Sequence, residues 1–157
     1  MNACRRTRGV AMRLGSDPAT VFPLLCPVRE SDWIETWRCE MVHSESGRAE
    51  LDCVFKTAFP SDGPEDVWVI SRHEPPLRIE FVRTNPLRVM RYAITLRPLA
   101  GGETEATWTQ VVTGLGAEGD RFVRSMDDAA FTGRMAALER MLNHYLGTGT
   151  MLMQRAD

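Results

Sequence analysis

Alternation of apolar and polar residues divides most of this sequence into predicted β-strands. The first lies over residues 5–14, where Val10, Met12 and Leu14 share one side. Beyond residue 36, six further segments alternate in the same way, and stretches containing Gly, Pro, Asn or Asp separate them. Consecutive strands with short connections favour an antiparallel meander. We therefore expect a seven-stranded antiparallel sheet.

The last four of these segments are separated by clear turn signals. They cover residues 67–72, 77–83, 90–97 and 105–112. Asn85-Pro86 separates the second segment from the third, and Ala100-Gly101-Gly102 separates the third from the fourth. Alternation places one apolar set on a dry face and a mainly charged set on a solvated face. The solvated set includes most arginines of these strands and of the preceding hairpin: Arg38, Arg48, Arg78, Arg91 and Arg97.

The best-defined strand pair is a hairpin between Thr36 and Phe59. Its segment Ser44-Glu45-Ser46-Gly47 is typical of a type I turn with Gly47 in the left-handed bulge position, which makes a three-residue loop. This turn places Ser44 opposite Arg48, and the register of both strands follows from that pair. On the dry face it sets Trp37, Cys39, Met41 and His43 opposite Phe55, Cys53, Leu51 and Ala49 in turn.

Two short helices are expected between the first strand and this hairpin. Asp17 and Pro18 are typical of a helix N-cap and first position, so a helix is predicted over Pro18–Leu25. A second short helix or turn is predicted over residues 28–34.

The C-terminal part of the chain has helical rather than strand periodicity. Apolar residues recur at helical spacing after residues 114–119, so one long helix is predicted from Asp120, its cap, to Leu146, with Gly147 ending it. The remaining residues to Asp157 are expected to form a loose tail, in which Met151, Leu152 and Met153 could dock.

Composition describes an ordinary globular chain. The 157 residues include 43% hydrophobic and 25% charged residues, with a net charge of −2. This length fits one domain over residues 1–157, with a core at about residues 8–148 and a tail at 149–157. All but one of the 19 basic residues are Arg, the exception being Lys56, yet the chain has no net positive charge, which argues against nucleic-acid binding.

The sequence contains no targeting signal and no metal-binding motif, which bears on the expected cellular location and on cofactor binding. The basic start lacks the apolar run of a signal peptide, and no segment is apolar over the length of a membrane span, so we expect a cytoplasmic protein without membrane insertion. In that compartment Cys4, Cys26, Cys39 and Cys53 are expected to be free thiols. His43, His73 and His144 share no ligand spacing, and no nucleotide-binding or nucleophile motif occurs, so neither a metal nor a cofactor is expected.

Three segments resemble the SRPBCC superfamily of START-like and Bet v 1-like proteins. They are DPATVFPLL after the first strand, GGETEATWTQ leading into the last strand, and ALERMLNHYLGTG at the end of the long helix. The resemblance covers about residues 8–148 and is closest to bacterial members with a CPVRE segment and an NHYLGTG ending. The superfamily includes polyketide cyclases and Hsp90-activator-like domains.

This resemblance implies an α+β helix-grip fold, in which a curved sheet wraps around the long C-terminal helix and leaves a cavity between them. Alternation then names the residues that face this cavity, although a core filled by its own side chains is the simpler alternative. The candidate ligand-binding residues are Trp37, Met41, His43, Phe55, Phe81, Arg83, Tyr92, Trp108 and Gln110.

The polar members of this set carry the candidate chemistry. Arg83 is expected to bind a ligand carboxylate or enolate, and His43 to donate a hydrogen bond or relay a proton, unless both lie exposed at the rim. Tyr92 and Gln110 are expected to be buried, bonded either to each other, to the backbone or to a ligand. The resemblance implies that Glu30, Asp32 and Trp33 lie in a segment that often forms the entrance of the cavity, but the favoured interpretation of Glu30 is an exposed pair with Arg29.

Three functions follow from these expectations. The first is binding of a small hydrophobic or aromatic ligand by a monomer or homodimer. The second is a polyketide cyclase or dehydratase, with His43 or Tyr92 as acid or base and Arg83 at an enolate. The third is an Hsp90-activator-like interaction module, which requires a small or closed cavity and an exposed apolar patch.

Overall fold

The computed structural model describes residues 2–154, so the end of the predicted tail, residues 155–157, lies outside the described part. The elements follow the chain in the order β1 (Arg5–Leu14), α1 (Pro18–Val21), η1 (Phe22–Leu25), α2 (Pro27–Glu30), β2 (Glu40–His43), β3 (Val54–Thr57), η2 (Pro60–Asp62), β4 (Asp66–Glu74), β5 (Arg78–Asn85), β6 (Arg88–Leu99), β7 (Glu103–Gly114), α3 (Gly116–Arg124) and α4 (Asp128–Thr148).

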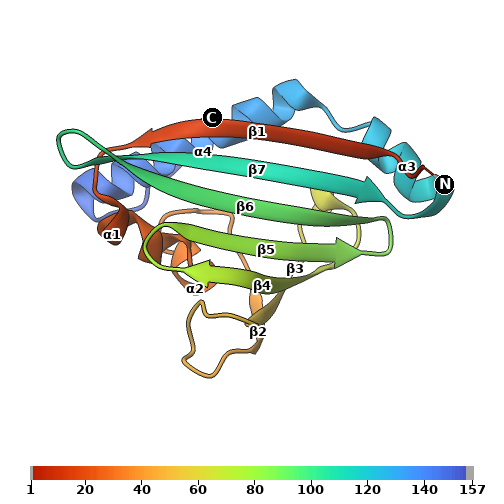
Figure 1. Cartoon of the computed structure of the whole chain (residues 1–157), viewed down its shortest axis with the longest axis horizontal. Helices are drawn as coiled ribbons and strands as arrows, with labels where there is room; N and C mark the ends of the chain where they lie inside the picture. Colours follow the sequence, from red (N-terminus) through yellow and green to blue (C-terminus); the bar gives the residue numbers. More distant parts are fainter. Residues whose placement is uncertain (1, 155–157) are drawn as a thin grey trace.

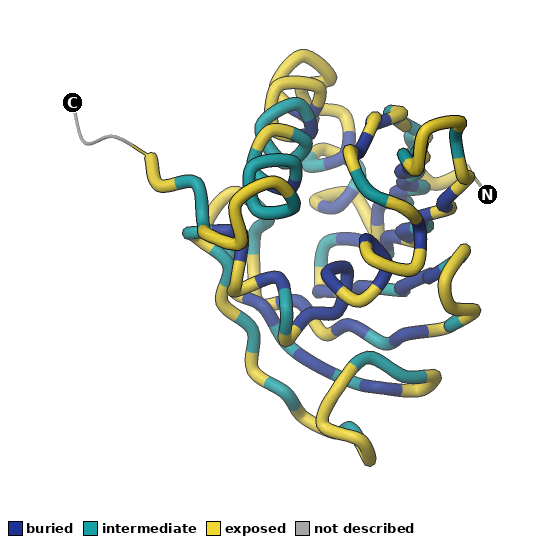
Figure 2. Tube along the Cα trace, turned by 90° about the vertical axis from the view of Figure 1, so that its left-hand side faces the viewer, coloured by how far each residue is buried: buried dark blue, intermediate teal, exposed yellow. Residues whose placement is uncertain are grey.

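All seven strands belong to one sheet, in the order β1-β7-β6-β5-β4-β3-β2, and every neighbouring pair is antiparallel. Figure 1 shows the strands one below another, with α4 lying behind the β1 and β7 end of the sheet. Figure 2 shows exposed residues on the outer turns of α4 and buried residues on its sheet side. The predicted seven-stranded antiparallel sheet and its packing against a C-terminal helix are confirmed.

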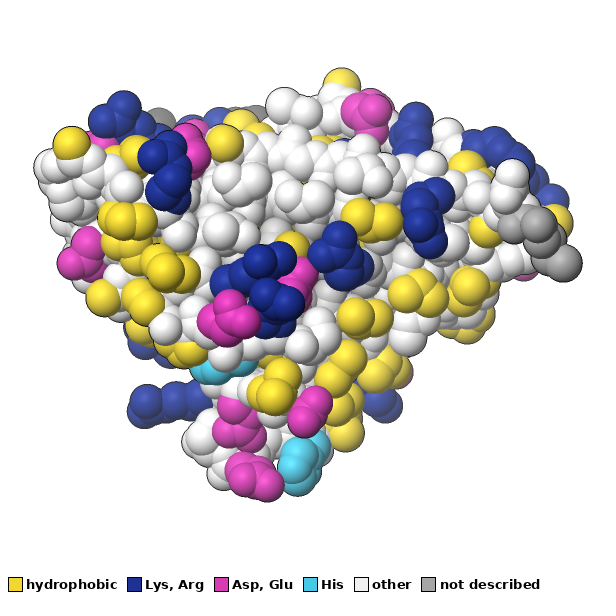
Figure 3. All heavy atoms as spheres, viewed as in Figure 1, with side chains coloured by type: hydrophobic (Ala, Val, Ile, Leu, Met, Phe, Trp, Pro, Cys, Tyr) yellow, Lys and Arg dark blue, Asp and Glu magenta, His cyan; other side chains and the backbone are white. Residues whose placement is uncertain are grey.

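The predicted alternation also identifies the dry face of three central strands, β5, β6 and β7. Tyr92 in β6 lies opposite Phe81 in β5 and Gln110 in β7, and all three residues are buried. The other face is polar. There Glu80 is bonded to Arg72 at 2.7 Å and to Arg91 at 2.9 Å. Figure 3 shows basic and acidic side chains gathered near the centre of the face of the molecule that is seen in Figure 1.

The hairpin has a different register from the predicted one. Met41 lies opposite Phe55 instead of Leu51, and a ten-residue connection from residue 44 to residue 53 replaces the three-residue loop. Gly47 has the predicted left-handed conformation, with φ of 75°. The longer connection is stabilised by the Glu50 carboxylate, which accepts hydrogen bonds from the Ser44 hydroxyl at 3.2 Å and the backbone N–H of Ser46 at 3.1 Å.

A second cause of the changed register is the pairing of Cys53 with the neighbouring strand. The carbonyl of Cys53 accepts a hydrogen bond from the N–H of Ile70 at 3.0 Å, so Cys53 is held against β4 and not opposite Cys39. Both residues are free thiols, as are Cys4 and Cys26 within the described chain. Leu51, expected on the dry face, is 56% exposed in the connection.

The first short helix forms where predicted. The Asp17 carboxylate accepts a hydrogen bond from the Thr20 N–H at 2.9 Å, and Pro18 occupies the first position. The predicted span divides into α1 and the tighter turn η1. The next helix, α2, begins at Pro27, one residue earlier than expected, because Pro also starts that turn.

The predicted single C-terminal helix is two helices. The chain leaves helical geometry between Arg124 and Asp128, and the Asp127 carboxylate caps α4 by accepting hydrogen bonds from the N–H groups of Ala129 at 2.9 Å and Ala130 at 3.3 Å. Asp120, the expected cap, instead accepts a hydrogen bond from the N–H of Cys4 at 2.9 Å. Gly149, not Gly147, ends α4 in the left-handed conformation. None of the helices described is long and apolar enough to cross a membrane.

Candidate functional site

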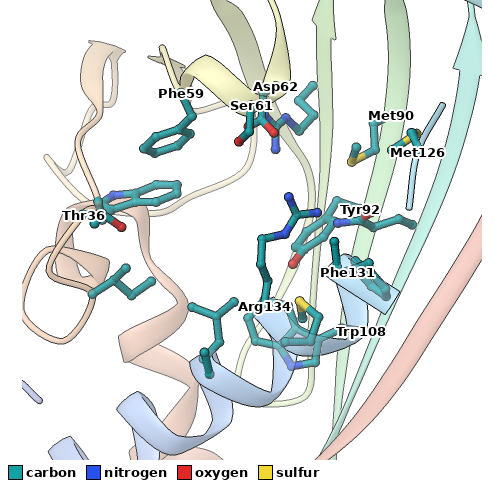
Figure 4. A pocket seen from close by; sticks show the side chains of 18 of the residues that line it. Thr36, Phe59, Ser61, Asp62, Met90, Tyr92, Trp108, Met126, Phe131 and Arg134 are labelled. Atoms are coloured by element: carbon teal, nitrogen blue, oxygen red, sulfur yellow. The ribbon is translucent and has the colours of Figure 1, made fainter. Parts of the chain in front are cut away.

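A pocket of about 670 Å³ lies between the dry face of the sheet, α4, and the segment that contains α2 and the loop after it. Its opening is flanked on one side by Thr36, Phe59 and Ser61, and on the other by the first turns of α4 (Figure 4). Side chains from five consecutive strands, β3 to β7, form its floor.

Five aromatic side chains form a continuous wall of this pocket. Phe55 stacks on Trp68 with ring centroids 5.1 Å apart, and Trp68 meets Phe81 edge-on at 5.7 Å. Phe81 lies 6.3 Å from Tyr92, which meets Trp108 edge-on at 5.7 Å. These separations are typical of favourable aromatic pairs. The wall arises because inward positions of neighbouring strands stand side by side, as Phe55 and Trp68 do across β3 and β4.

The structure brings seven of the nine candidate residues to this pocket. They are Trp37, Phe55, Phe81, Arg83, Tyr92, Trp108 and Gln110. The other two candidates lie elsewhere. Met41 packs its sulfur against Cys53 at 3.5 Å, and His43, expected to face inward, is exposed at the end of edge strand β2. An irregularity between Met41 and His43 breaks the alternation on which that expectation depended.

Arg83 faces inward, but its charge is already bound by the protein. Its guanidinium is paired with Asp62 at 2.6 Å and with Asp66, and it lies over the ring of Trp68 at 4.1 Å. The same Asp66 is held by Arg88 through two hydrogen bonds of 2.7 Å and 2.9 Å. Arg83 therefore holds the η2 segment and the Trp68 ring in place, and the expectation that it anchors a ligand carboxylate is not supported by this geometry.

Glu30 is the largest departure from expectation at the site. Arg29 pairs with Asp32 at 2.7 Å, whereas Glu30 is only 9% exposed and lines the pocket. Its carboxyl group makes no hydrogen bond or ion pair with other residues in the range 2–154. Burial alone raises its pKa well above the ordinary value, because no nearby group stabilises the charged form.

Tyr92 stands at the centre of the polar part of the pocket. Its hydroxyl points into the space beside Arg134 (Figure 4). Burial raises the pKa of this hydroxyl, and the negative charge of Glu30 raises it further, while Arg83, Gln110 and Arg134 act in the opposite direction. The phenol therefore stays protonated at neutral pH and is available as a hydrogen-bond donor.

Two guanidinium groups complete the pocket. Arg8 in β1 donates from Nε to the Oε1 atom of Gln110 at 2.9 Å and lies over the ring of Phe131 at 4.3 Å. Burial lowers the pKa of Arg8, and the nearby positive charge of Arg134 lowers it further. Arg134 reaches from α4 toward Tyr92 (Figure 4), and no carboxylate of the described residues lies within ion-pair distance of it.

The sequence-based list omitted several residues of this pocket, and for some of them a signal exists. Residues two apart in a strand point to the same face, so Arg8 lies on the face of Val10 and Met12. In the same way, Arg88 lies on the face of Met90 and Tyr92. Extending each alternation by one step would have placed both arginines inward. Glu30 and Arg134 carry no such signal, because the position of a short helix or a helix face relative to the sheet is decided by packing.

Comparisons with known proteins identify the fold. No family model matches the chain, and no curated protein matches it. Solved structures do match. The Zhui aromatase/cyclase from Streptomyces sp. R1128 aligns with a TM-score of 0.68 at 12% identity, over 94% of this chain and 99% of that one. Ara h 8.0201 aligns with a TM-score of 0.63 at 13% identity, over 90% and 97%.

A third solved structure extends beyond this chain. DynU16, from the dynemicin biosynthetic locus, aligns with a TM-score of 0.60 at 18% identity over 92% of this chain, and the alignment covers 48% of DynU16, so the chain spans about half of that protein. At these identities, the likeness to all three structures concerns the fold.

Proposed function

Starting from the helix-grip fold that the chain shares with the SRPBCC and Bet v 1-like superfamily, we propose that this protein binds a small aromatic ligand between the sheet and α4. The observation that carries the proposal is the continuous aromatic wall from Phe55 to Trp108 on an open pocket. A pocket of about 670 Å³ is of the size that holds small ligands, about 300–1,000 Å³. Flat aromatic ligands stack on such walls and gain apolar burial.

Two further considerations favour this function. The hypothesis of an interaction module requires a small or closed cavity, whereas the pocket has a volume of about 670 Å³. In addition, one protein of this fold, Zhui, is named an aromatase/cyclase, which supports an aromatic ligand for this pocket.

A neutral aromatic probe tests the proposal directly. Methyl 6-hydroxy-2-naphthoate is expected to bind at one molecule per chain, measured by calorimetry and native mass spectrometry, and to raise the melting temperature. The variant Ala130→Trp places a bulky ring at the pocket opening and is expected to lower the affinity at least tenfold. Ala129→Trp is the matched control, because Ala129 is exposed beside it but does not line the pocket. Absence of saturable binding, or equal affinities in both variants, would overturn the proposal.

A second candidate function is acid–base catalysis on the bound ligand. It is favoured by one observation, the unpartnered Glu30 carboxyl with its raised pKa, whose charge acts on Tyr92. A raised pKa makes the carboxylate a stronger base, which suits it to abstract a proton next to a carbonyl. The test is deuterium exchange at the activated carbon of 2-tetralone, followed by NMR. Native protein is expected to accelerate exchange and Glu30→Gln to abolish the acceleration, whereas equal rates would contradict this role.

A further inference from the structure

Two positively charged groups of the pocket have no anionic partner there. Arg8 uses Nε to bond Gln110 and its guanidinium face to cover Phe131, which leaves its terminal nitrogens without a hydrogen bond among the described residues. Arg134 is exposed on α4, lines the pocket, and makes neither a hydrogen bond nor an ion pair with the residues of the range 2–154. The nearby Asp128 is shared with Arg6, at 3.5 Å, and is largely exposed. The two guanidinium groups act on each other as like charges, so an anion between them is favoured.

Glu30 and Tyr92 form a second polar group that lines the same pocket. The Glu30 carboxyl is nine-tenths buried and unpartnered, and it lines the same pocket. The Tyr92 hydroxyl points into the space beside Arg134 (Figure 4), and Glu30 and Arg8 line the same pocket. A ligand in this pocket that contacts the Tyr92 hydroxyl therefore shares the pocket with both kinds of group.

We propose that the ligand is an aromatic acid bearing a second polar substituent, with its carboxylate held by Arg8 and Arg134 and its hydroxyl or carbonyl group at Glu30 and Tyr92. Paired guanidinium groups bind carboxylates through several charge-assisted hydrogen bonds. The aromatic body then lies along the wall that begins at Trp68 and Phe81. This inference rests on the proposed function and adds to it the chemical class of the ligand.

Three related probes measure separately the contribution of the ligand's carboxylate and that of its hydroxyl group. They are 6-hydroxy-2-naphthoate, its methyl ester, and 2-naphthoate without the hydroxyl. In native protein the hydroxy acid is expected to bind about tenfold more tightly than its ester, which lacks the charge, and severalfold more tightly than 2-naphthoate, which lacks the second polar group.

Substitutions in the pocket test which residues cause the preference for the acid over its ester and which cause the preference for the hydroxyl group. Arg134→Gln is expected to remove most of the preference for acid over ester while the ester still binds, and Arg8→Gln is expected to act in the same way. Arg140→Gln is the matched control, because Arg140 is exposed on the same helix and does not line the pocket. Glu30→Met is expected to remove the preference for the hydroxyl and to leave the acid preference unchanged. Circular dichroism establishes that each variant is folded.

The outcomes distinguish this inference from the proposed function. If the acid and its ester bind native protein equally well, or if Arg140→Gln changes the ratio as much as Arg134→Gln, the inference is wrong, while ligand binding in the pocket stands. If no probe binds, the proposed function itself fails.

Discussion

Arg8 and Gln110 are direct neighbours across β1 and β7, and the arginine Nε donates a hydrogen bond of 2.9 Å to the Oε1 atom of the glutamine. This bond fixes the plane of a guanidinium that is also packed on Phe131. Gln110 thus acts as a positioning residue, and the partly buried guanidinium of Arg8 points into the pocket because Gln110 and Phe131 hold it from two sides.

The first prediction concerns this bond. Gln110→Leu is expected to reduce the preference for 6-hydroxy-2-naphthoate over its methyl ester by about two- to tenfold, since one hydrogen bond contributes about 0.5–1.5 kcal/mol to the orientation of Arg8. The affinity for the ester should change less. Calorimetry with both probes measures the ratio, and Thr109→Val, at the neighbouring position on the other face of β7, serves as the control.

The second prediction concerns the charge network at the pocket wall, formed by Asp62, Asp66, Arg83 and Arg88. Asp66→Asn is expected to lower the free energy of unfolding by about 3–5 kcal/mol, because Arg88, 1% exposed, then has no anionic partner and Arg83 keeps only Asp62. Urea unfolding at constant pH measures the change. Glu65→Gln removes the exposed pair with Lys56 at 3.6 Å and should cost about 0–1 kcal/mol. Comparable losses in the two variants would refute a special role for the network.

The third prediction is a pH dependence due to Glu30. Burial raises the pKa of this carboxyl in the folded protein above its ordinary value of 4.5, so between these two values the folded state binds more protons than the unfolded state. Its contribution to stability is therefore greatest at low pH and is lost as the pH rises through this window. The variant Glu30→Gln has no carboxyl group at this position, so this decrease in stability with rising pH should be absent from it.

Urea unfolding at a series of pH values tests this dependence. Near pH 4 the native protein and Glu30→Gln should be similar in stability, and at pH 8 the variant should be more stable by about 1–3 kcal/mol. The exposed residue Glu45 provides the control variant Glu45→Gln. A constant difference between native protein and Glu30→Gln across the series would show that Glu30 does not titrate in this way.

The fourth prediction concerns the break between α3 and α4. Asp127→Ala is expected to lower the free energy of unfolding by about 1 kcal/mol, because two N–H groups of the first turn lose the acceptor that caps the helix. The neighbouring Asp128→Ala removes only a long pair with Arg6 and should cost less. Thermal and urea unfolding compare the two variants, and a larger loss from Asp128→Ala would contradict the assignment of Asp127 as the cap.

The alternation of apolar and polar residues predicted which face of the sheet the side chains of regular strands point to. The aromatic wall at Phe81, Tyr92 and Trp108 follows from it, because side chains of a strand point alternately to its two faces over any regular length. The alternation predicted the wrong face for His43, because edge strand β2 is irregular between Met41 and His43. It also could not show that Arg83, although inward, is neutralised by Asp62 and Asp66 from elsewhere in the chain.

By itself, the sequence determined the antiparallel sheet, the helix that covers it and the dry face of the central strands, since local periodicity and turn residues specify these features. Only the tertiary structure decided the chemistry of the pocket. It placed Glu30 and Arg134, on separate helices, beside Tyr92 of the sheet, and it paired Arg83 while leaving Arg8 and Arg134 without an anion. The physical reason is that the charge state and the availability of a group that lines a pocket depend on neighbours distant in sequence, through desolvation and ion pairing.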